Sequence, residues 1–184
     1  MPSRTPPSRT GALLARAIAM IAALGISTAI PACGAAFDGT TYRAKGIAFE
    51  VPPQPESWQT IEVSHAALAF RDVASDATIA VNGRCGQDAP DVPLASLTQH
   101  LFLQFTEREI LTQEVIPFDQ REAMHTVLLA KLDGVPKKFD VWVLKKDGCV
   151  FDLLYIASPD RFDAGIEQFQ RFARGFKALP TDAS

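Results

Sequence analysis

Three short turn sequences constrain the fold of this chain more than any other feature. Asp119-Gln120, Asp133-Gly134 and Asp147-Gly148 separate four runs that are rich in apolar and β-branched residues. Asp-Gly between two such runs is a strong signal for a β-hairpin. We therefore predict an antiparallel meander over residues 110–118, 121–132, 135–145 and 149–157.

The runs of this meander carry apolar residues at both alternations. In the third run, Phe139, Val141 and Val143 alternate with Trp142 and Leu144. Because successive side chains of a strand point to opposite faces of a sheet, we expect much of the sheet to be covered on both faces. Helices on its two sides would provide that cover.

Two amphipathic helices are predicted, one before and one after the meander. The first spans residues 93–108, and its apolar side chains recur at helical spacing (Leu94, Leu97, Leu101 and Phe105). The second begins with Ser158 as the N-cap residue and Pro159 in the first turn. Its apolar stripe is expected to pack against the sheet (Phe162, Ile166, Phe169, Ala173 and Phe176).

Strand-like stretches also precede the first helix, at residues 42–51, 58–64, 67–73 and 77–82. Three prolines separate the first two stretches, since proline cannot continue a central strand (Pro52, Pro53 and Pro55). The predicted fold class is α+β, with an antiparallel β-sheet flanked by helices. One domain over residues 42–179 accommodates these elements and leaves a short tail at residues 180–184.

The N-terminal segment is predicted to be a signal peptide over residues 1–32. Its arginines supply positive charge (Arg4, Arg9 and Arg16), residues 17–32 are uncharged, and the first acid is Asp38. A membrane-spanning helix is the competing interpretation. It needs about 20 apolar residues, whereas this run is shorter and ends at Ile30-Pro31.

Cys33 is the candidate lipidation site, because Ile30-Pro31-Ala32-Cys33-Gly34 resembles a bacterial lipobox. Acylation of Cys33 would attach the domain to a membrane through a tether at residues 33–41. Gly34 stands where aspartate is the usual inner-membrane retention signal, which implies the periplasmic face of the outer membrane. The alternative is cleavage by the ordinary signal peptidase at Gly34-Ala35-Ala36, which would discard Cys33.

Cys85 and Cys149 form an even pair once Cys33 is lipidated or removed. In an oxidising compartment such a pair is more often a disulfide than two free thiols. The bond would close a loop of about 64 residues. A redox-active thiol is the alternative, although the sequence holds no C-x-x-C motif.

The net charge of the chain indicates which class of partner it is suited to bind. The whole chain has a net charge of −3, and loss of the three leader arginines makes the remaining 152 residues about −6. Binding to phosphate backbones relies on clustered Lys and Arg. We therefore expect no nucleic-acid partner.

A family resemblance rests on the first half of the predicted domain. Tyr42 precedes Gly46-Ile47-Ala48-Phe49-Glu50-Val51-Pro52, and further apolar elements follow (Trp58, Phe70-Arg71-Asp72, Ile79-Ala80-Val81, Leu94 and Leu97). This order resembles the opening of PsbP-like domains, which are α/β/α sandwiches that include many small secreted or lipid-anchored bacterial proteins. The resemblance implies a binding or assembly role. The metal sites of the photosynthetic members have no residue-by-residue match here, so we predict no metal or cofactor.

Motifs that carry catalysis are missing from the sequence of the predicted domain, which holds no H-E-x-x-H, P-loop, G-x-G-x-x-G or G-x-S-x-G. Ser64 and His65 are adjacent, and neighbouring residues of a strand point to opposite faces, so they do not make a nucleophile and its base. His65, His100 and His125 lack the paired spacing of metal ligands. We therefore predict no catalytic residue and no metal site.

Three polar residues remain candidates for a functional role: Asp152, Arg71 and Arg121. Asp152 lies between Phe151 and Leu153 in an apolar strand. If it is buried and paired with Arg71 or Arg121, its role is structural. If it lines a pocket with a raised pKa, its role is functional.

The function expected from these observations is that of a lipid-anchored, non-enzymatic interaction or assembly factor of the cell envelope. It would recognise an envelope protein through an exposed patch or strand edge. Two alternatives stay open. A carrier of a small apolar ligand or lipid requires an apolar cavity between sheet and helices, and a hydrolytic enzyme requires convergent polar groups in a cleft.

Overall fold

The structure is a computed structural model that describes residues 36–44 and 46–181. The predicted leader and Cys33 lie outside the described residues. Among the described residues, no helix is long and apolar enough to cross a membrane.

The predicted meander is confirmed. It consists of β7 (Thr106–Phe118), β8 (Arg121–Leu132), β9 (Val135–Lys146) and β10 (Cys149–Ala157), each antiparallel to the next. All three connections are two-residue turns that begin with an aspartate at positive φ, namely 46° at Asp119, 51° at Asp133 and 50° at Asp147. Positive φ at the first turn residue is typical of the hairpin turns that Asp-Gly favours.

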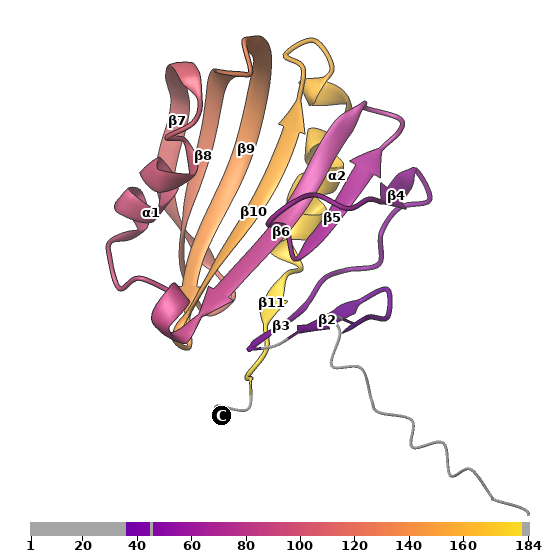
Figure 1. Cartoon of the computed structure of the whole chain (residues 1–184). Coiled ribbons are helices and arrows are strands. Elements are labelled where there is room, and N and C mark those ends of the chain that lie inside the picture. The colour runs from indigo at the N-terminus through magenta and orange to yellow at the C-terminus, as the bar shows by residue number, and fades with distance from the viewer. Residues whose placement is uncertain (1–35, 45, 182–184) are drawn as a thin grey trace, which may run out of the picture. The chain divides into compact units, whose positions relative to one another are not determined.

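Three earlier strands extend the meander into a seven-stranded antiparallel sheet with the order β4-β5-β6-β10-β9-β8-β7. They are β4 (Trp58–Thr60), β5 (Leu68–Asp72) and β6 (Ala77–Cys85), and a 3₁₀ turn at Gly86–Asp88 follows β6. β6 pairs with β10, so β10 lies at the centre of the sheet. β4 and β7 are the two edges (Figure 1).

Each face of this sheet is covered by one helix, α1 (Leu94–Leu101) on one face and α2 (Phe162–Arg174) on the other (Figure 1). The side chains of alternate β10 residues pack into the two cores on opposite faces of the sheet. Phe151, Leu153 and Tyr155 face α2, whereas Val150 and Leu154 face α1. The apolar residues at both alternations of the meander therefore fill two separate cores, as the sequence pattern predicts.

The core under α2 is largely aromatic. The rings of Phe49, Phe151 and Phe176 lie 5.3–6.2 Å apart, and the Tyr155 ring stacks on Phe169 at 5.4 Å. A Cβ atom at Gly165 would lie 2.6 Å from the Tyr155 hydroxyl. α2 can thus approach the sheet closely only because position 165 lacks a side chain.

A second, four-stranded sheet lies against the α2 core, with the order β1-β2-β3-β11. Its strands are β1 (Ala36–Phe37), β2 (Thr41–Ala44), β3 (Ile47–Glu50) and β11 (Lys177–Ala178). The single strand predicted at residues 42–51 is thus a hairpin, because Gly46 turns the chain with φ of 74°. Part of the predicted tether also belongs to the domain, since Phe37 packs against this core.

α1 is shorter than predicted, because it ends at Leu101 instead of continuing to residue 108. The chain turns at Phe102, whose carbonyl oxygen accepts a hydrogen bond from the Phe105 amide at 3.0 Å. Phe105 then stacks on Phe139 with 4.7 Å between ring centroids. Its apolar contact is therefore made from a turn, which helical spacing alone cannot distinguish from a helix.

α2 begins at Phe162, three residues later than the predicted Pro159. Ser158 is not its N-cap residue. The Ser158 carbonyl instead accepts a hydrogen bond from the Arg161 amide at 3.0 Å and closes a turn before the helix. The predicted apolar stripe is confirmed, since Phe162, Phe169 and Ala173 are buried.

Candidate functional site

The most exposed element of the main sheet is its edge strand β7. All ten residues from Thr106 to Val115 are exposed, although the strand is thirteen residues long and pairs with β8 along its length. The cover that the sequence predicts for much of the sheet therefore does not extend to this edge. The opposite edge, β4, has only three residues and begins with the buried Trp58.

The side of β7 that faces α1 carries two exposed apolar residues, beside the polar Gln113 and Arg108. Ile110 lies opposite Leu128 and Val115 opposite Met124 in the register with β8, and both partners belong to the core under α1. Ile110 and Val115 themselves are 51% and 52% exposed. No described strand pairs with the outer side of β7, so these two apolar side chains stand beside a row of backbone donors and acceptors that the described strands leave unpaired.

A groove of about 410 Å³ runs between the C-terminal end of α1 and β7. Leu128 forms part of its lining, with Ile110 on one side and Phe102 and Leu103 on the other. Leu103 is 64% exposed. The apolar strip of β7 therefore continues across this groove to the turn after α1.

The side of β7 that faces α2 is acidic. Glu109 lies opposite Leu129 and Glu114 opposite His125, and the Glu114 side chain is 57% exposed. β7 thus presents apolar side chains on one face of the sheet and carboxylates on the other. Register shifts between Thr106 and Glu109 and between Ile110 and Thr112 leave a regular ladder only from Thr112 to Phe118.

A buried polar network connects this edge to the interior. The Nε2 atom of His125 lies 3.0 Å from a carboxylate oxygen of Asp140, which also accepts a hydrogen bond from the Trp142 indole at 2.6 Å. The second Asp140 oxygen accepts a hydrogen bond from Gln170 on α2 at 3.1 Å. Nδ1 of His125 lies 3.5 Å from Glu114.

Two opposing effects act on the pKa of His125. Burial lowers it, but the carboxylates of Asp140 and Glu114 outweigh burial, so the pKa lies above its ordinary value. Both ring nitrogens face carboxylates, which leaves neither free to activate a nucleophile. The network is therefore suited to stabilising a charged imidazole.

Asp152 is fully buried, but its partner is neither Arg71 nor Arg121. Arg84 on β6 donates a hydrogen bond from Nη1 to Oδ2 of Asp152 at 2.6 Å. Burial raises the pKa of Asp152, and the Arg84 guanidinium only partly opposes that shift. Among the described residues, Oδ1 of Asp152 has no hydrogen-bond partner. The arginine that pairs with Asp152 is thus neither of the two candidates, and the ion pair joins β6 to β10.

Arg84 could have been found from the predicted disulfide. Cys85 and Cys149 lie directly opposite each other in the β6–β10 register, with a Cα–Cα separation of 4.0 Å. That register places Asp152 opposite Asn82, and Arg84 two residues along on the same face. The structure contains the Cys85–Cys149 disulfide, as the cysteine count predicts.

The other two candidate residues lie at turns of the surface. Arg71 pairs with Asp76 across the β5–β6 hairpin, and both side chains are exposed. Arg121 lies 3.7 Å from Asp147, with both side chains more than half exposed. Neither arginine contacts Asp152. Surface pairs of this kind contribute little to stability.

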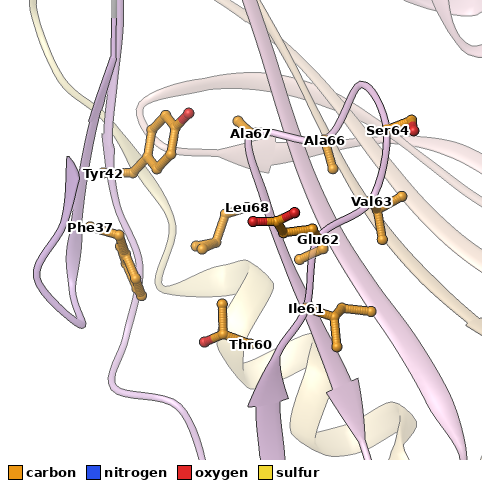
Figure 2. A pocket seen from close by; sticks show the side chains of 11 residues that line it. Phe37, Tyr42, Thr60, Ile61, Glu62, Val63, Ser64, Ala66, Ala67 and Leu68 are labelled. Carbon is orange, nitrogen blue, oxygen red and sulfur yellow. The ribbon is translucent and has the colours of Figure 1, made fainter. Parts of the chain in front are cut away.

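A second groove, of about 690 Å³, lies between the small sheet and the chain that joins β4 to β5 (Figure 2). Phe37 and Tyr42 lie on one side of it, and Glu62 and Leu68 lie on the other (Figure 2). Burial raises the pKa of Tyr42. The groove combines one aromatic wall with one exposed acid, and its described lining holds no basic side chain.

The described residues show no gathering of catalytic or metal-binding side chains. His65 and His100 are exposed and lie on different elements, the β4–β5 connection and α1. In the described part of the chain, no three or more His, Cys, Asp or Glu side chains are placed to hold a metal ion.

Comparison with known proteins finds similarity in structure alone. No family model and no curated protein sequence matches the chain. The cyanobacterial PsbP protein of Synechocystis sp. PCC 6803 superposes with a TM-score of 0.58 and 16% identity, over 80% of this chain and 97% of that protein.

Two further solved structures are similar. LpqN of Mycobacterium tuberculosis, described as involved in cell envelope biogenesis, has a TM-score of 0.52 and 14% identity over 74% of this chain and 87% of its own. A Pseudomonas aeruginosa protein described as a putative regulator has a TM-score of 0.52 and 14% identity over 77% and 98%. The fold predicted by resemblance is therefore confirmed: the domain has a PsbP-like fold.

Proposed function

We propose that this chain is a non-enzymatic interaction or assembly factor of the cell envelope, held on the periplasmic side of the outer membrane by a lipid on Cys33. The observation that carries the interaction role is the edge strand β7, whose residues from Thr106 to Val115 are all exposed. A sheet edge of this length is a template for another chain.

The hydrogen bonds made by the two buried acids Asp140 and Asp152 support a role without catalysis. Asp140 accepts hydrogen bonds from three side chains, and Asp152 pairs with Arg84. Each arrangement joins neighbouring elements of the fold. Neither presents a free acid, base and nucleophile to a common open cleft, as an active site requires.

The envelope location is supported by two further observations. A disulfide between Cys85 and Cys149 suits an oxidising compartment. One structural neighbour, LpqN, is described as involved in cell envelope biogenesis. Attachment through Cys33 rests on the lipobox-like sequence, because Cys33 lies outside the described residues.

A carrier for an apolar ligand is less well supported. It requires a cavity between sheet and helix, but aromatic rings fill the space under α2, with Phe70 and Phe172 6.1 Å apart and Tyr155 stacked on Phe169. The grooves described above open at the surface instead. We therefore do not propose a carrier.

Attachment is tested by metabolic labelling with a palmitate analogue in the native host. The wild-type chain is expected to be labelled and to fractionate with outer membranes, whereas Cys33→Ala loses both properties. Labelling of Cys33→Ala at the wild-type level would refute the anchor.

The interaction role is tested by photo-crosslinking in intact cells with a photoreactive residue at Val115, at Val63 beside the groove of Figure 2, or at Val73 in the β5–β6 turn. The control position Val73 is as exposed as Val115, at 56% against 52%. We expect a protein adduct of one defined mass from Val115 and none from Val73. Failure of all three positions to form an adduct would overturn the interaction role.

A further inference from the structure

The two faces of β7 differ in chemistry, and this difference restricts what can bind there. Ile110 and Val115 are exposed on the face toward α1, and Glu109 and Glu114 on the face toward α2. A strand added to β7 would place its own side chains alternately on the same two faces. Its apolar side chains would meet Ile110 and Val115, and side chains on its other face would meet two carboxylates.

We propose that β7 binds an extended segment of a partner polypeptide in which apolar and basic residues alternate, so that the segment becomes an eighth strand of the sheet. This inference rests on the proposed interaction function and names the chemistry of its partner. The backbone of β7 supplies the hydrogen bonds, and the side chains select the sequence.

The groove between α1 and β7 determines where the apolar side chains of the segment go. Ile110, Leu103 and Leu128 form part of the apolar lining of this groove, which has a volume of about 410 Å³ and is also lined by Arg108 and Gln99. It lies on the apolar face of β7, beside the free edge. An aliphatic side chain of the added strand would be removed from water there, which is favourable in proportion to the apolar area buried.

The charges on the α2 side of β7 determine which side chains the bound segment can place on that face. Glu107 is already paired with Lys131 at 2.7 Å, and Arg108 donates a hydrogen bond to the Phe102 carbonyl on the α1 side at 3.2 Å. Glu109 and Glu114 are the other acids on the α2 side of the edge; Glu114 also lies 3.5 Å from Nδ1 of His125, but its side chain is 57% exposed. Lys or Arg opposite them would form favourable cross-strand pairs.

The same charges disfavour a second copy of this chain as the occupant. Antiparallel pairing of two β7 strands about a two-fold axis keeps equivalent faces on the same side. Glu109 and Glu114 of one copy would then lie beside the same acids of the other. Like charges across a strand pair are destabilising, so the geometry favours a basic partner.

A peptide-binding experiment tests this proposal. The full chain, exported with its own leader and purified in detergent, is titrated into a fluorescent seven-residue peptide of alternating Val and Lys, and binding is followed by anisotropy. Peptides with Glu in place of Lys, or with alternate backbone nitrogens methylated, serve as controls. We expect saturable binding of the Val-Lys peptide and at least tenfold weaker binding of both controls.

Variants of the chain identify the surface. Val115→Lys is expected to weaken binding of the Val-Lys peptide at least tenfold, because it places a cation and a polar group on the apolar face. Val73→Lys, at an equally exposed valine far from β7 in the sheet order, should bind as the wild type does. Circular dichroism of both variants verifies that the fold is kept.

Three outcomes would overturn the proposal: equal binding of the Val-Glu peptide, equal binding of the methylated peptide, or unchanged binding by Val115→Lys. Sedimentation that shows a dimer dissolved by Val115→Lys would assign the edge to a second copy. If the peptide fails while the Val115 photo-adduct forms in cells, the interaction function stands and only the proposed alternation of apolar and basic residues in the partner is wrong.

Discussion

β10 and β7 belong to the same sheet and lie three places apart, yet their surroundings are opposite. Eight of the nine residues of β10 are buried, whereas the first ten residues of β7 are all exposed. Their sequences differ as well, because seven of the first ten residues of β7 are polar, whereas Asp152 is the one charged residue of β10. The difference shows that composition and position in the strand order together determine whether a strand becomes core or surface.

The largest difference between the two strands should appear on truncation of their apolar side chains. Phe151→Ala in β10 is expected to lower the free energy of unfolding by about 3–5 kcal/mol, because it leaves a cavity beside Phe49 and Phe176. Val115→Ala in β7 should change it by less than about 0.5 kcal/mol. Chemical denaturation measures both. Equal losses would mean that β7 is covered in solution.

Removal of the disulfide should cause the next largest loss of stability, because this bond joins β6 to the central strand β10. It closes a loop with a sequence separation of 64. Cys85→Ala/Cys149→Ala is expected to lower the free energy of unfolding by about 2–4 kcal/mol in the chain-entropy account. Wild-type protein in excess reductant should match the double variant, and the double variant should not respond to reductant. A reductant effect on the double variant would assign the loss to another cause.

The buried ion pair of the central strands should outweigh a surface pair. Arg84→Ala leaves the Asp152 carboxyl buried without its guanidinium, and we expect a loss of about 2 kcal/mol, below the usual cost for fully buried pairs because Arg84 is 30% exposed. Arg71→Ala removes the exposed pair with Asp76 and should cost less than about 1 kcal/mol. Denaturation curves of the two variants decide the comparison, and a larger loss for Arg71→Ala would contradict it.

The smallest expected change in stability concerns His125, which lies between Glu114 on the edge strand and the buried Asp140. Its pKa lies above the ordinary value of 6.5, so the folded chain binds the proton more tightly than the unfolded chain. The resulting stabilisation is fully present below a pH of about 6.5 and is lost as the pH rises through the folded-state pKa. The stability difference between wild type and His125→Gln should therefore fall with rising pH.

Titration of the His125 ring by NMR provides the direct measurement. A midpoint below 6.5 would show that burial, and not the carboxylates of Asp140 and Glu114, determines the pKa. Glu114→Gln should lower the midpoint, because it removes the partner that β7 contributes at 3.5 Å. An unchanged midpoint would mean that the edge strand does not influence the interior network.

The meander could be predicted because its signals are local. Asp133-Gly134 and Asp147-Gly148 determine the turns, and the predicted strands at residues 121–132 and 149–157 match β8 and β10 at both ends. Spacing was less informative at Phe105, where a turn satisfies the same periodicity as a helix. The disulfide followed from the count of cysteines and the expected compartment.

The candidate site was harder to predict because it depends on which strands become neighbours. Asp152 was selected as a candidate whose burial was left open, and Arg84 was missed because it becomes a neighbour of Asp152 only through the β6–β10 register. Glu109, Glu114 and Val115 were missed, although the charged residues near them are typical of an exposed edge strand.

The sequence by itself determined the hairpins, the amphipathic stripe of α2 and the pairing of the two cysteines. The turn residues and the helical spacing are signals within short segments, and the cysteine pair follows from the number of cysteines. The tertiary structure decided that β6 pairs with β10, that Arg84 reaches Asp152 and that β7 is left without a neighbour on its outer side among the described strands. The physical reason is that edge status and ion pairing depend on long-range strand order, in which a residue's environment is determined by segments distant from it along the chain.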